Sequence, residues 1–388
     1  MKVKKLVAKK IKDTRGEATI EIKLVTNDGE FVSSAPNGKS KGEFEKPVWK
    51  KSLAGDIKAV NKYFIEDISI NNFDDLILIE NAFSDRVGGN TMIALEYCFL
   101  KALAKQEDKQ VWELINPRAS KIPMPVGNII GGGLHSKNSK SNFQEFHIIP
   151  IANSFELANK ILKRAHENVN EILSNLDSNF KKKLNDENAW ISGLNEEKII
   201  EVMDNVKENM IEEFGCKIHI GIDVAASSFY KNGNYFYGND KKNKKSVKEQ
   251  VEYIKKLSDK FYYLEDPLEE NDFKGFSEIL KKSKGLIVGD DLTVTNLDRL
   301  EIAVKNKSIN AIIIKPNQVG SLIEIKKIVS FCKKNNIKMI FSHRSGETSE
   351  DIISDLAFGF GADFVKFGAL GKGRDEKLQR LIEIEEGL

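Results

Sequence analysis

The sequence lacks the features that mark several classes of protein. No apolar run approaches the ~20 residues that a membrane-spanning helix needs. The basic start MKVKKLVAKKIK lacks the apolar segment of a secretory signal. Sixty basic and 58 acidic side chains give a net charge of +2, without the basic excess that is typical of nucleic-acid-binding proteins. We therefore expect neither a membrane nor a nucleic acid as a partner.

Cysteine is scarce as well. Cys98, Cys216 and Cys332 lie far apart in the chain, without the paired spacing of a zinc site or a redox dithiol. We expect all three to be reduced and buried in the core, which suits a cytoplasmic protein.

The length and the order of patterns predict two domains. A chain of 388 residues exceeds the usual size of a single core, so a large barrel with a smaller domain is the natural expectation. Residues 17–35 alternate apolar and polar side chains around a turn and predict a hairpin, whereas 90–106 has helical spacing. We predict an α+β domain at 1–118 and a barrel domain at 119–388.

The second half repeats one pattern six times. Short apolar runs end in a charged or polar residue, and most follow one another at intervals of about 25 residues; these end residues are Asp223, Glu265, Asp290, Lys315, His343 and Lys366. A leucine-rich solenoid has a similar period, but its leucine and asparagine ladder is absent here. The pattern therefore favours parallel strands with crossover helices, a (β/α) barrel whose active site lies at the carboxyl ends of the strands.

Three carboxylates would meet at that end of the barrel. Asp223, Glu265 and Asp290 end three successive predicted strands. A set of carboxylate oxygens favours magnesium over zinc. The alternative is that each residue only caps the following helix, but three in register with Lys315 favour a metal site.

Basic and further acidic residues belong to the same pattern. A cation near Lys315 would lower its pKa and allow it to act as a base. Arg344 and Ser345 have the chemistry of a phosphate site, although Arg344 alone could equally form a structural salt bridge. Glu145, Glu187 and His135 are weak candidates when each is considered alone.

An ordered set of motifs resembles the enolase family. The motifs are DTRGEATIEI, GGGLHSKNSKSNFQEFHIIP, GIDVAASSFY, YLEDPLEENDF, VGDDLTVTN, KPNQVGSL and HRSGETSEDIISDLAFGFGADFVKFGA. The resemblance covers nearly the whole chain. It implies an enolase-type (β/α)8 (TIM-like) barrel, beginning with an irregular ββαα turn and preceded by the smaller α+β domain with a mobile active-site loop at 36–45.

The resemblance also implies an activity and its cofactor. The expected reaction is the reversible dehydration of 2-phosphoglycerate to phosphoenolpyruvate in glycolysis and gluconeogenesis, by a hydro-lyase with two magnesium ions per active site. A lysine or histidine base with one or two Mg²⁺ ions is the general pattern of enolase-superfamily sites. A homodimer or higher homo-oligomer is expected as well.

The resemblance assigns roles to individual residues. The first magnesium is expected on Asp223, Glu265 and Asp290, and the second on Ser40. Lys315 is the expected base for the C2 proton, and Glu187 with Glu145 helps the C3 hydroxyl to leave. Lys366 is expected to face the substrate carboxylate, and Arg344, Ser345 and His135 to hold the phosphate. His343 is expected as a further substrate-binding residue.

The sequence departs from the family pattern in two loops near these residues. Lys39 and Lys41 flank Ser40 in the mobile loop, and Asn188 and Ala189 follow Glu187 where the family has glycines. The second of these loops, residues 185–189, is called the acid loop below. Its altered sequence keeps open the alternative that the protein is an enolase-superfamily dehydratase acting on another phosphorylated or acidic 2-hydroxy acid. A non-catalytic enolase-like binding protein is the third hypothesis, although none of the expected catalytic residues is missing.

Overall fold

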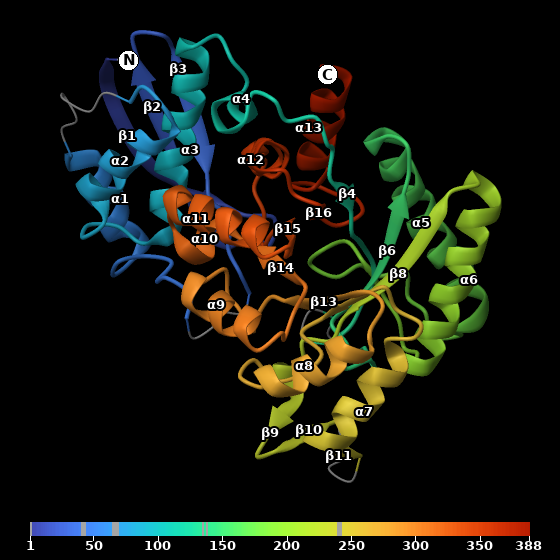
Figure 1. The fold of residues 1–388 in the computed structure, drawn as a ribbon. Coiled ribbons are helices and arrows are strands. Elements are labelled where there is room, and N and C mark those ends of the chain that lie inside the picture. Colours follow the sequence, from blue (N-terminus) through green and yellow to red (C-terminus); the bar gives the residue numbers. More distant parts are fainter. Residues whose placement is uncertain (1, 40–43, 64–69, 134–135, 137–138, 239–242) are drawn as a thin grey trace.

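The N-terminal part of the chain is a three-stranded antiparallel sheet packed against helices (Figure 1). The computed structural model describes residues 2–39, 44–63, 70–133, 136, 139–238 and 243–388. The N-terminal elements are β1 (Val3–Lys12), β2 (Ala18–Thr26), β3 (Glu30–Ser34), α1 (Leu53–Lys62), η1 (Phe73–Asp75), α2 (Leu76–Phe83), α3 (Gly89–Gln106) and α4 (Val111–Ile115). The hairpin predicted at 17–35 is thus confirmed as β2 and β3, which pair antiparallel.

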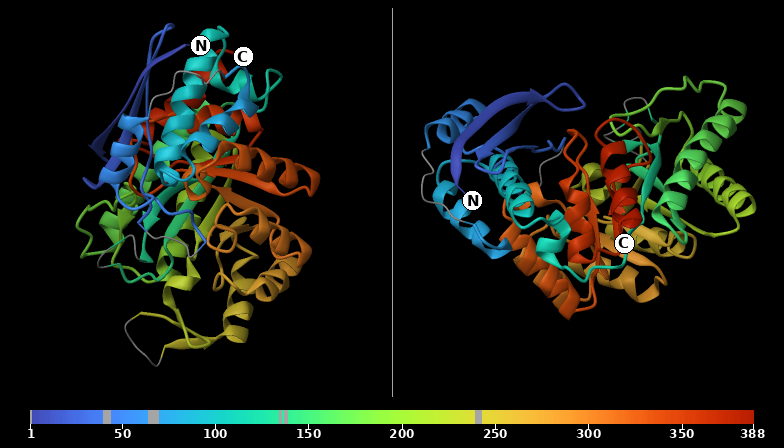
Figure 2. Two further views of the ribbon diagram at one scale, coloured as in Figure 1. Left: turned by 90° about the vertical axis from the view of Figure 1, so that its left-hand side faces the viewer. Right: turned by 90° about the horizontal axis from the view of Figure 1, so that it is seen from above.

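Helix α3 joins this sheet to the second part of the molecule. It packs against β2 and β3 on one side and against α10 (Pro316–Val319) of the barrel on another. Figures 1 and 2 show it between the blue strands and the orange helices. Nearly all of its residues are buried, polar Asn90, Thr91 and Glu96 included. Helix α3 is therefore part of a core shared by both parts of the molecule. The helical spacing in the sequence predicted an apolar stripe on one side only, not burial on all sides.

The second part is built mostly from strands that alternate with helices. Its elements up to β11 are β4 (Met124–Pro125), β5 (Gly127–Gly131), β6 (Glu145–Ile151), α5 (Phe155–Leu176), β7 (Trp190–Ile191), α6 (Glu196–Phe214), β8 (Lys217–Asp223), η3 (Ala226–Phe229), β9 (Tyr230–Lys231), β10 (Asn234–Phe236) and β11 (Lys244–Ser246). The remaining elements are α7 (Val247–Leu257), β12 (Tyr263–Glu265), α8 (Phe273–Lys282), β13 (Leu286–Gly289), α9 (Leu297–Lys305), β14 (Ala311–Ile314), α10 (Pro316–Val319), α11 (Leu322–Lys334), β15 (Lys338–Ser342), α12 (Ile352–Phe360), β16 (Phe364–Lys366) and α13 (Asp375–Glu386).

These strands curl into the predicted barrel. The sheet order is β4-β16-β15-β14-β13-β12-β8-β6-β5-β7, and β8 and β12 to β16 are parallel. The first strands form an antiparallel β5–β6 pair followed by α5 and α6, which is the expected irregular beginning. Residues 124–131 pair with β16 at one end and with β6 at the other, so the sheet turns back on itself.

The barrel interior is filled by side chains and leaves its active end open. A cluster of buried apolar residues plugs it, namely Val126, Ile149, Tyr263, Leu286, Val288, Ala311, Ile313, Ile340 and Phe364. This cluster is a packed core rather than a pore, as in other barrels of this type. The charged residues predicted at the strand ends lie at the carboxyl end of this plug.

Three expectations about the whole chain can be compared with the structure. Cys98 and Cys332 are buried, but Cys216 is only half-buried because it lies at the turn after α6; its assignment to the core was wrong. In the part of the chain that the structure describes, no helix is long and apolar enough to cross a membrane. The boundary at 118/119 falls between α4 and β4 and stays a prediction.

Candidate active site

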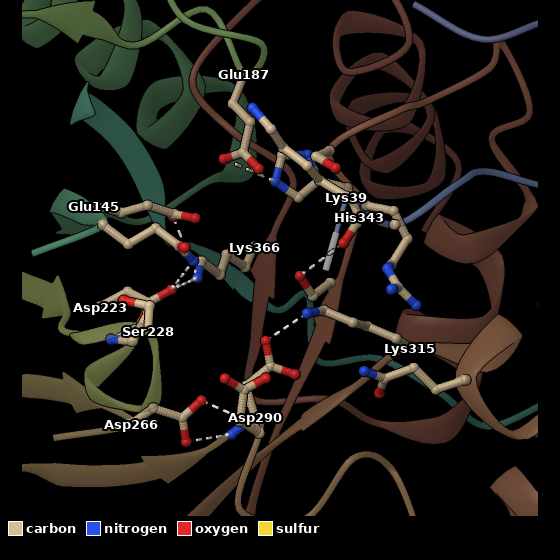
Figure 3. Close-up of a pocket in the computed structure, with 18 of the residues that line it drawn as sticks. Lys39, Glu145, Glu187, Asp223, Ser228, Asp266, Asp290, Lys315, His343 and Lys366 are labelled. Carbon is tan, nitrogen blue, oxygen red and sulfur yellow. Dashed lines mark hydrogen bonds and ion pairs between the residues drawn. The ribbon is translucent and has the colours of Figure 1, made fainter. Parts of the chain in front are cut away.

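A cavity of about 80 Å³ lies at the carboxyl end of the barrel strands (Figure 3). Its lining is almost entirely polar and comes from barrel strands, the acid loop and the N-terminal domain, with Gly38, Lys39, Glu45, Gln144, Glu145, Glu187, Asp223, Ala225, Ser228, Asp266, Asp290, Asp291, Lys315, Gln318, Ser342, His343, Arg344, Ser345 and Lys366. The cavity is small because these charged side chains reach into it and pair with one another.

Strand register brings three carboxylates side by side. β8 lies between β6 and β12, and Asp223 is the register partner of both Glu145 and Glu265. All three are buried. Burial raises the pKa of Asp223 to about 7, and burial together with the charge of Asp223 raises the pKa of Glu265 to about 7. Like charges held this close favour a cation among them.

Lys366, at the end of β16, supplies a cation to this group. Its Nζ lies 2.8 Å from Glu265 Oε2, 3.2 Å from Glu145 Oε2 and 3.3 Å from Asp223 Oδ2. Burial acts to lower the pKa of Lys366, but Glu145, Glu265 and Asp223 outweigh it and raise that pKa well above its usual range. Lys366 is therefore a permanent cation in the substrate-free protein.

Lys315 forms an ion pair with the neighbouring carboxylate at the end of β13. Its Nζ donates to Asp290 Oδ2. Burial acts to lower the pKa of Lys315, but this pair raises it above the ordinary value. Arg344 and Lys366 act to lower the pKa, as expected of nearby cations, but in the protein alone Asp290 outweighs them and holds the proton on the amine. A cation bound to Asp290 would remove this effect.

The three carboxylates that lie closest together include Asp266 in place of the predicted Asp223. Glu265, Asp266 and Asp290 each offer an oxygen within 4.8 Å of the others. Asp266 Oδ1 and Oδ2, however, already accept the backbone N–H groups of Asp290 and Asp291. Asp266 thus holds the β13 loop with both of its oxygens. Asp223 accepts one backbone N–H on Oδ1, and its Oδ2 accepts only from the side chains of Gln144 and Lys366, which a cation can displace. Asp223 is therefore the better third candidate.

Two buried oxygens remain available in this group. Glu265 Oε1 and Asp290 Oδ1 have no hydrogen-bond partner among the described residues. A buried carboxylate oxygen without a partner is costly. A hard divalent cation accepts such ligands, so the donor set fits a divalent metal.

Glu187 approaches the cavity from the acid loop, at the opposite end from Asp290 (Figure 3). Asn128 Nδ2 donates to Glu187 Oε2 over 3.2 Å, and His343 Nε2 lies 3.8 Å from the same oxygen. Burial, followed by the charge of Arg374, lowers the pKa of His343 well below its usual range, so the imidazole is neutral. Burial and the charge of Glu187 raise the pKa of Glu145 well above its usual range.

Arg344 faces a carboxylate from the N-terminal domain. Its guanidinium lies 3.2 Å from Glu45 Oε1 and also donates to Asn317 Oδ1 over 3.0 Å. Ser345 Oγ accepts a hydrogen bond of 2.9 Å from Arg15. Residues from the N-terminal part of the chain thus hold Arg344 and Ser345 in place.

Known proteins resemble this chain over its whole length. Residues 119–388 match the family described as "Enolase, C-terminal TIM barrel domain". The chain is 35% identical to the enolase of Thermoplasma acidophilum, with 100% of this chain and 98% of the relative covered. For the enolase of Sulfurisphaera tokodaii the identity is 37%, with 99% and 95% covered. The chain belongs to the enolase family.

Membership of the enolase family implies a divalent metal, which agrees with the donor set described above. Two residues that the enolase resemblance assigned to the site, Ser40 and His135, lie outside the described residues. All the other assigned residues line the cavity except Glu265, which lies directly beside it in β12.

The enolase-type motifs did not reveal every residue at this site. Asp266 follows Glu265 directly, and Arg15 lies in the DTRGEATIEI motif, so both had a signal in the sequence. Glu45 had none. Its position on Arg344 arises from the packing of the N-terminal domain on the barrel.

Proposed function

We propose that the protein is a hydro-lyase that interconverts 2-phosphoglycerate and phosphoenolpyruvate. The observation that carries this proposal is the cavity at the barrel end, where Lys315 and Lys366 face buried carboxylates and Arg344 lies at one wall. Membership of the enolase family, over the whole chain, supports the same reaction.

Asp223, Glu265 and Asp290 would hold magnesium, and the unpartnered Glu265 Oε1 and Asp290 Oδ1 support this assignment. Two ions per active site are proposed, with Ser40, which lies outside the described residues, as a ligand of the second. The metal would neutralise the extra negative charge that develops on the substrate carboxylate when its neighbouring carbon loses a proton.

Lys315 would be the base. In the protein alone its amine is held protonated by Asp290. Once Asp290 has another cation to neutralise it, the neutral Lys315 Nζ takes the C2 proton and becomes an ammonium group. Lys366 remains charged throughout and stabilises the substrate carboxylate.

Glu187 and Glu145 would form the acid side of the reaction. The raised pKa of Glu145 supports a protonated carboxyl in the pair. A proton passes from this pair to the C3 hydroxyl, which then leaves as water while the C2–C3 double bond forms. The two steps balance, since one proton is taken at C2 and one is delivered at C3.

Arg344, Ser345 and His135 would bind the phosphate, and His343 would contact the substrate beside Glu187. Arg344 already carries an anionic partner, Glu45. We infer that the substrate phosphate replaces this carboxylate on the guanidinium, because phosphate oxygens match its paired N–H groups.

The altered acid loop does not favour another substrate. Asn188 adopts a positive φ of 62°, and Asn185 Oδ1 accepts the backbone N–H of Glu187 over 2.9 Å. Asparagine tolerates this conformation better than most residues. The loop thus directs Glu187 into the cavity without the glycines.

We further propose a cytoplasmic homodimer or higher homo-oligomer. The free cysteines support a reducing compartment. The proposed oligomeric state rests on family membership alone. Light scattering of the purified protein would measure it.

The proposed reaction can be tested directly with the purified full chain. With 2-phosphoglycerate and Mg²⁺, absorbance of phosphoenolpyruvate should appear, and EDTA should abolish it until Mg²⁺ is restored. Absence of turnover by folded protein that binds Mg²⁺ would overturn the proposed substrate.

A further inference from the structure

A layer of uncharged residues lies directly beneath the carboxylates in the barrel interior. Gly221 of β8 is the register partner of His147 in β6 and of Tyr263 in β12. Two residues further toward the open end, Asp223 is the partner of Glu145 and Glu265 in the same strands. Side chains two residues apart in a strand share a face, so the two layers are stacked.

Tyr263 and His147, which lie on either side of Gly221 in the lower layer, each contact the carboxylate above them. Tyr263 Oη donates to Glu265 Oε2 over 2.5 Å. His147 Nε2 lies 2.8 Å from Glu145 Oε2. Both side chains are fully buried, and their rings meet edge to face with centroids 5.3 Å apart.

Gly221 makes this contact possible. A Cβ atom there would lie 2.8 Å from Tyr263 Cβ and 3.2 Å from the edge of its ring. Because β8 contributes no side chain at this level, His147 and Tyr263 can meet across it. A larger residue would push Tyr263 away from Glu265.

The hydrogen bonds to Glu265 engage one of its oxygens and leave the other without a partner. Tyr263 and Lys366 both bond to Glu265 Oε2, and Glu265 Oε1 has no partner among the described residues. A carboxylate held by one oxygen cannot rotate freely, so the other oxygen keeps its direction. The outer partners of ligands act in this way in metal sites.

We propose that His147, Gly221 and Tyr263 form a positioning layer that orients Glu145 and Glu265 toward the cavity. Tyr263 fixes the oxygen of Glu265 that faces a divalent cation, and His147 fixes Glu145. The two are positioning residues, since neither lines the cavity. The part that concerns catalysis rests on the proposed function, whereas the part that concerns the cation does not.

Tyr263→Phe and His147→Leu test this layer, because each removes a hydrogen-bonding group and keeps an apolar side chain of similar size. In Tyr263→Phe the affinity of the substrate-free protein for Mg²⁺, measured by titration calorimetry, should fall about tenfold or more. In His147→Leu, kcat for 2-phosphoglycerate should fall about tenfold or more with little change in KM. His147→Gln, whose amide can donate or accept a hydrogen bond, should recover much of it.

A second histidine–tyrosine pair in the chain offers a matched control. His219 and Tyr262 stack with centroids 4.0 Å apart and line no part of the cavity. Tyr262→Phe and His219→Leu should leave the Mg²⁺ affinity and kcat unchanged. Circular dichroism and thermal melting establish that each variant is folded.

The outcomes separate this proposal from the proposed function. Mg²⁺ affinity in folded Tyr263→Phe equal to that of the wild type would overturn the positioning layer, because a space-filling residue tolerates loss of the hydroxyl. Weaker Mg²⁺ binding in Tyr263→Phe would support it even if the wild type did not turn over 2-phosphoglycerate. Equal losses in the control pair would overturn it as well.

Discussion

Lys315 and Asp290 form an ion pair between the ends of neighbouring strands β14 and β13. The pair holds the proton on the amine of the proposed base, and it also occupies one oxygen of a proposed metal ligand. Proton and metal chemistry would therefore be coupled at Asp290. A divalent cation bound by this carboxylate would also allow Lys315 to lose its proton.

Lys315→Ala should affect catalysis and metal binding in opposite directions. We expect kcat to fall by about 10²–10⁴-fold, the usual contribution of a positioned base. Mg²⁺ should bind more tightly, because the ammonium that competes for Asp290 is gone. Phosphoenolpyruvate absorbance and calorimetry measure the two effects. Lys338→Ala, which removes an exposed lysine paired with Asp363, is the control. Unchanged kcat in the Lys315 variant would contradict the assignment.

Gly38→Ala should weaken substrate binding. A Cβ atom at Gly38 would overlap the guanidinium of Arg344 and displace it from its position in the cavity wall. Loss of a charge-assisted contact to phosphate should raise KM for 2-phosphoglycerate roughly tenfold, with a smaller effect on kcat. Gly387→Ala is the matched control, because a Cβ atom there meets only ordinary contacts. An unchanged KM would mean that Arg344 does not contact the substrate.

Lys39→Ala should reduce kcat/KM most at low ionic strength. Lys39 lines the cavity and lies 2.8 Å from Asp186 of the acid loop, with both side chains about one-third exposed. An exposed pair contributes little to stability, so the melting temperature should not change. A positive charge at the mouth attracts an anionic substrate, and salt screens that attraction.

Asp186→Ala distinguishes the two roles that Lys39 can have. If Lys39 acts only by holding the acid loop, the two variants should lose the same activity, and the double variant should lose no more. If Lys39 attracts the substrate directly, Asp186→Ala should retain or increase kcat/KM. Lys121→Ala, on an exposed pair with Asp363, provides the baseline. A loss in Lys39→Ala that does not depend on salt would contradict the electrostatic explanation.

Glu96→Gln should change how stability depends on pH. Burial, and then the charge of Glu80, raise the pKa of Glu96 well above its usual range, so the folded protein holds a proton there. The unfolded chain releases that proton above the ordinary pKa of glutamate. The wild type therefore loses stability relative to Glu96→Gln as pH rises through this interval, by at most about 1.4 kcal/mol per pH unit.

Urea unfolding at several pH values measures the effect of Glu96→Gln. The amide can still accept the Leu322 N–H bond of 2.9 Å, so the variant should fold. Glu107→Gln, at the exposed end of the same helix, should follow the wild type. Parallel curves for wild type and Glu96→Gln would show that Glu96 is ionised in the folded state.

Much of the fold was predictable because its signals are local. Each barrel strand from β8 to β16 is a short apolar run that ends in a charged or polar position, and the spacing reports the helix between runs. Parallel strands with crossover helices place all such ends at one face. The motifs that resemble the enolase family then supplied the expected roles, which the sequence pattern alone did not assign.

What the sequence by itself determined is the order of the strands, the residue at the end of each, and the family. Only the tertiary structure decided which of these residues pair. Lys315 contacts Asp290, Glu45 contacts Arg344, and His147 contacts Tyr263, and each pair joins separate segments of the chain. The physical reason is that register between strands and the docking of the N-terminal domain set these distances. Residue types and their spacing along the chain do not encode them one by one.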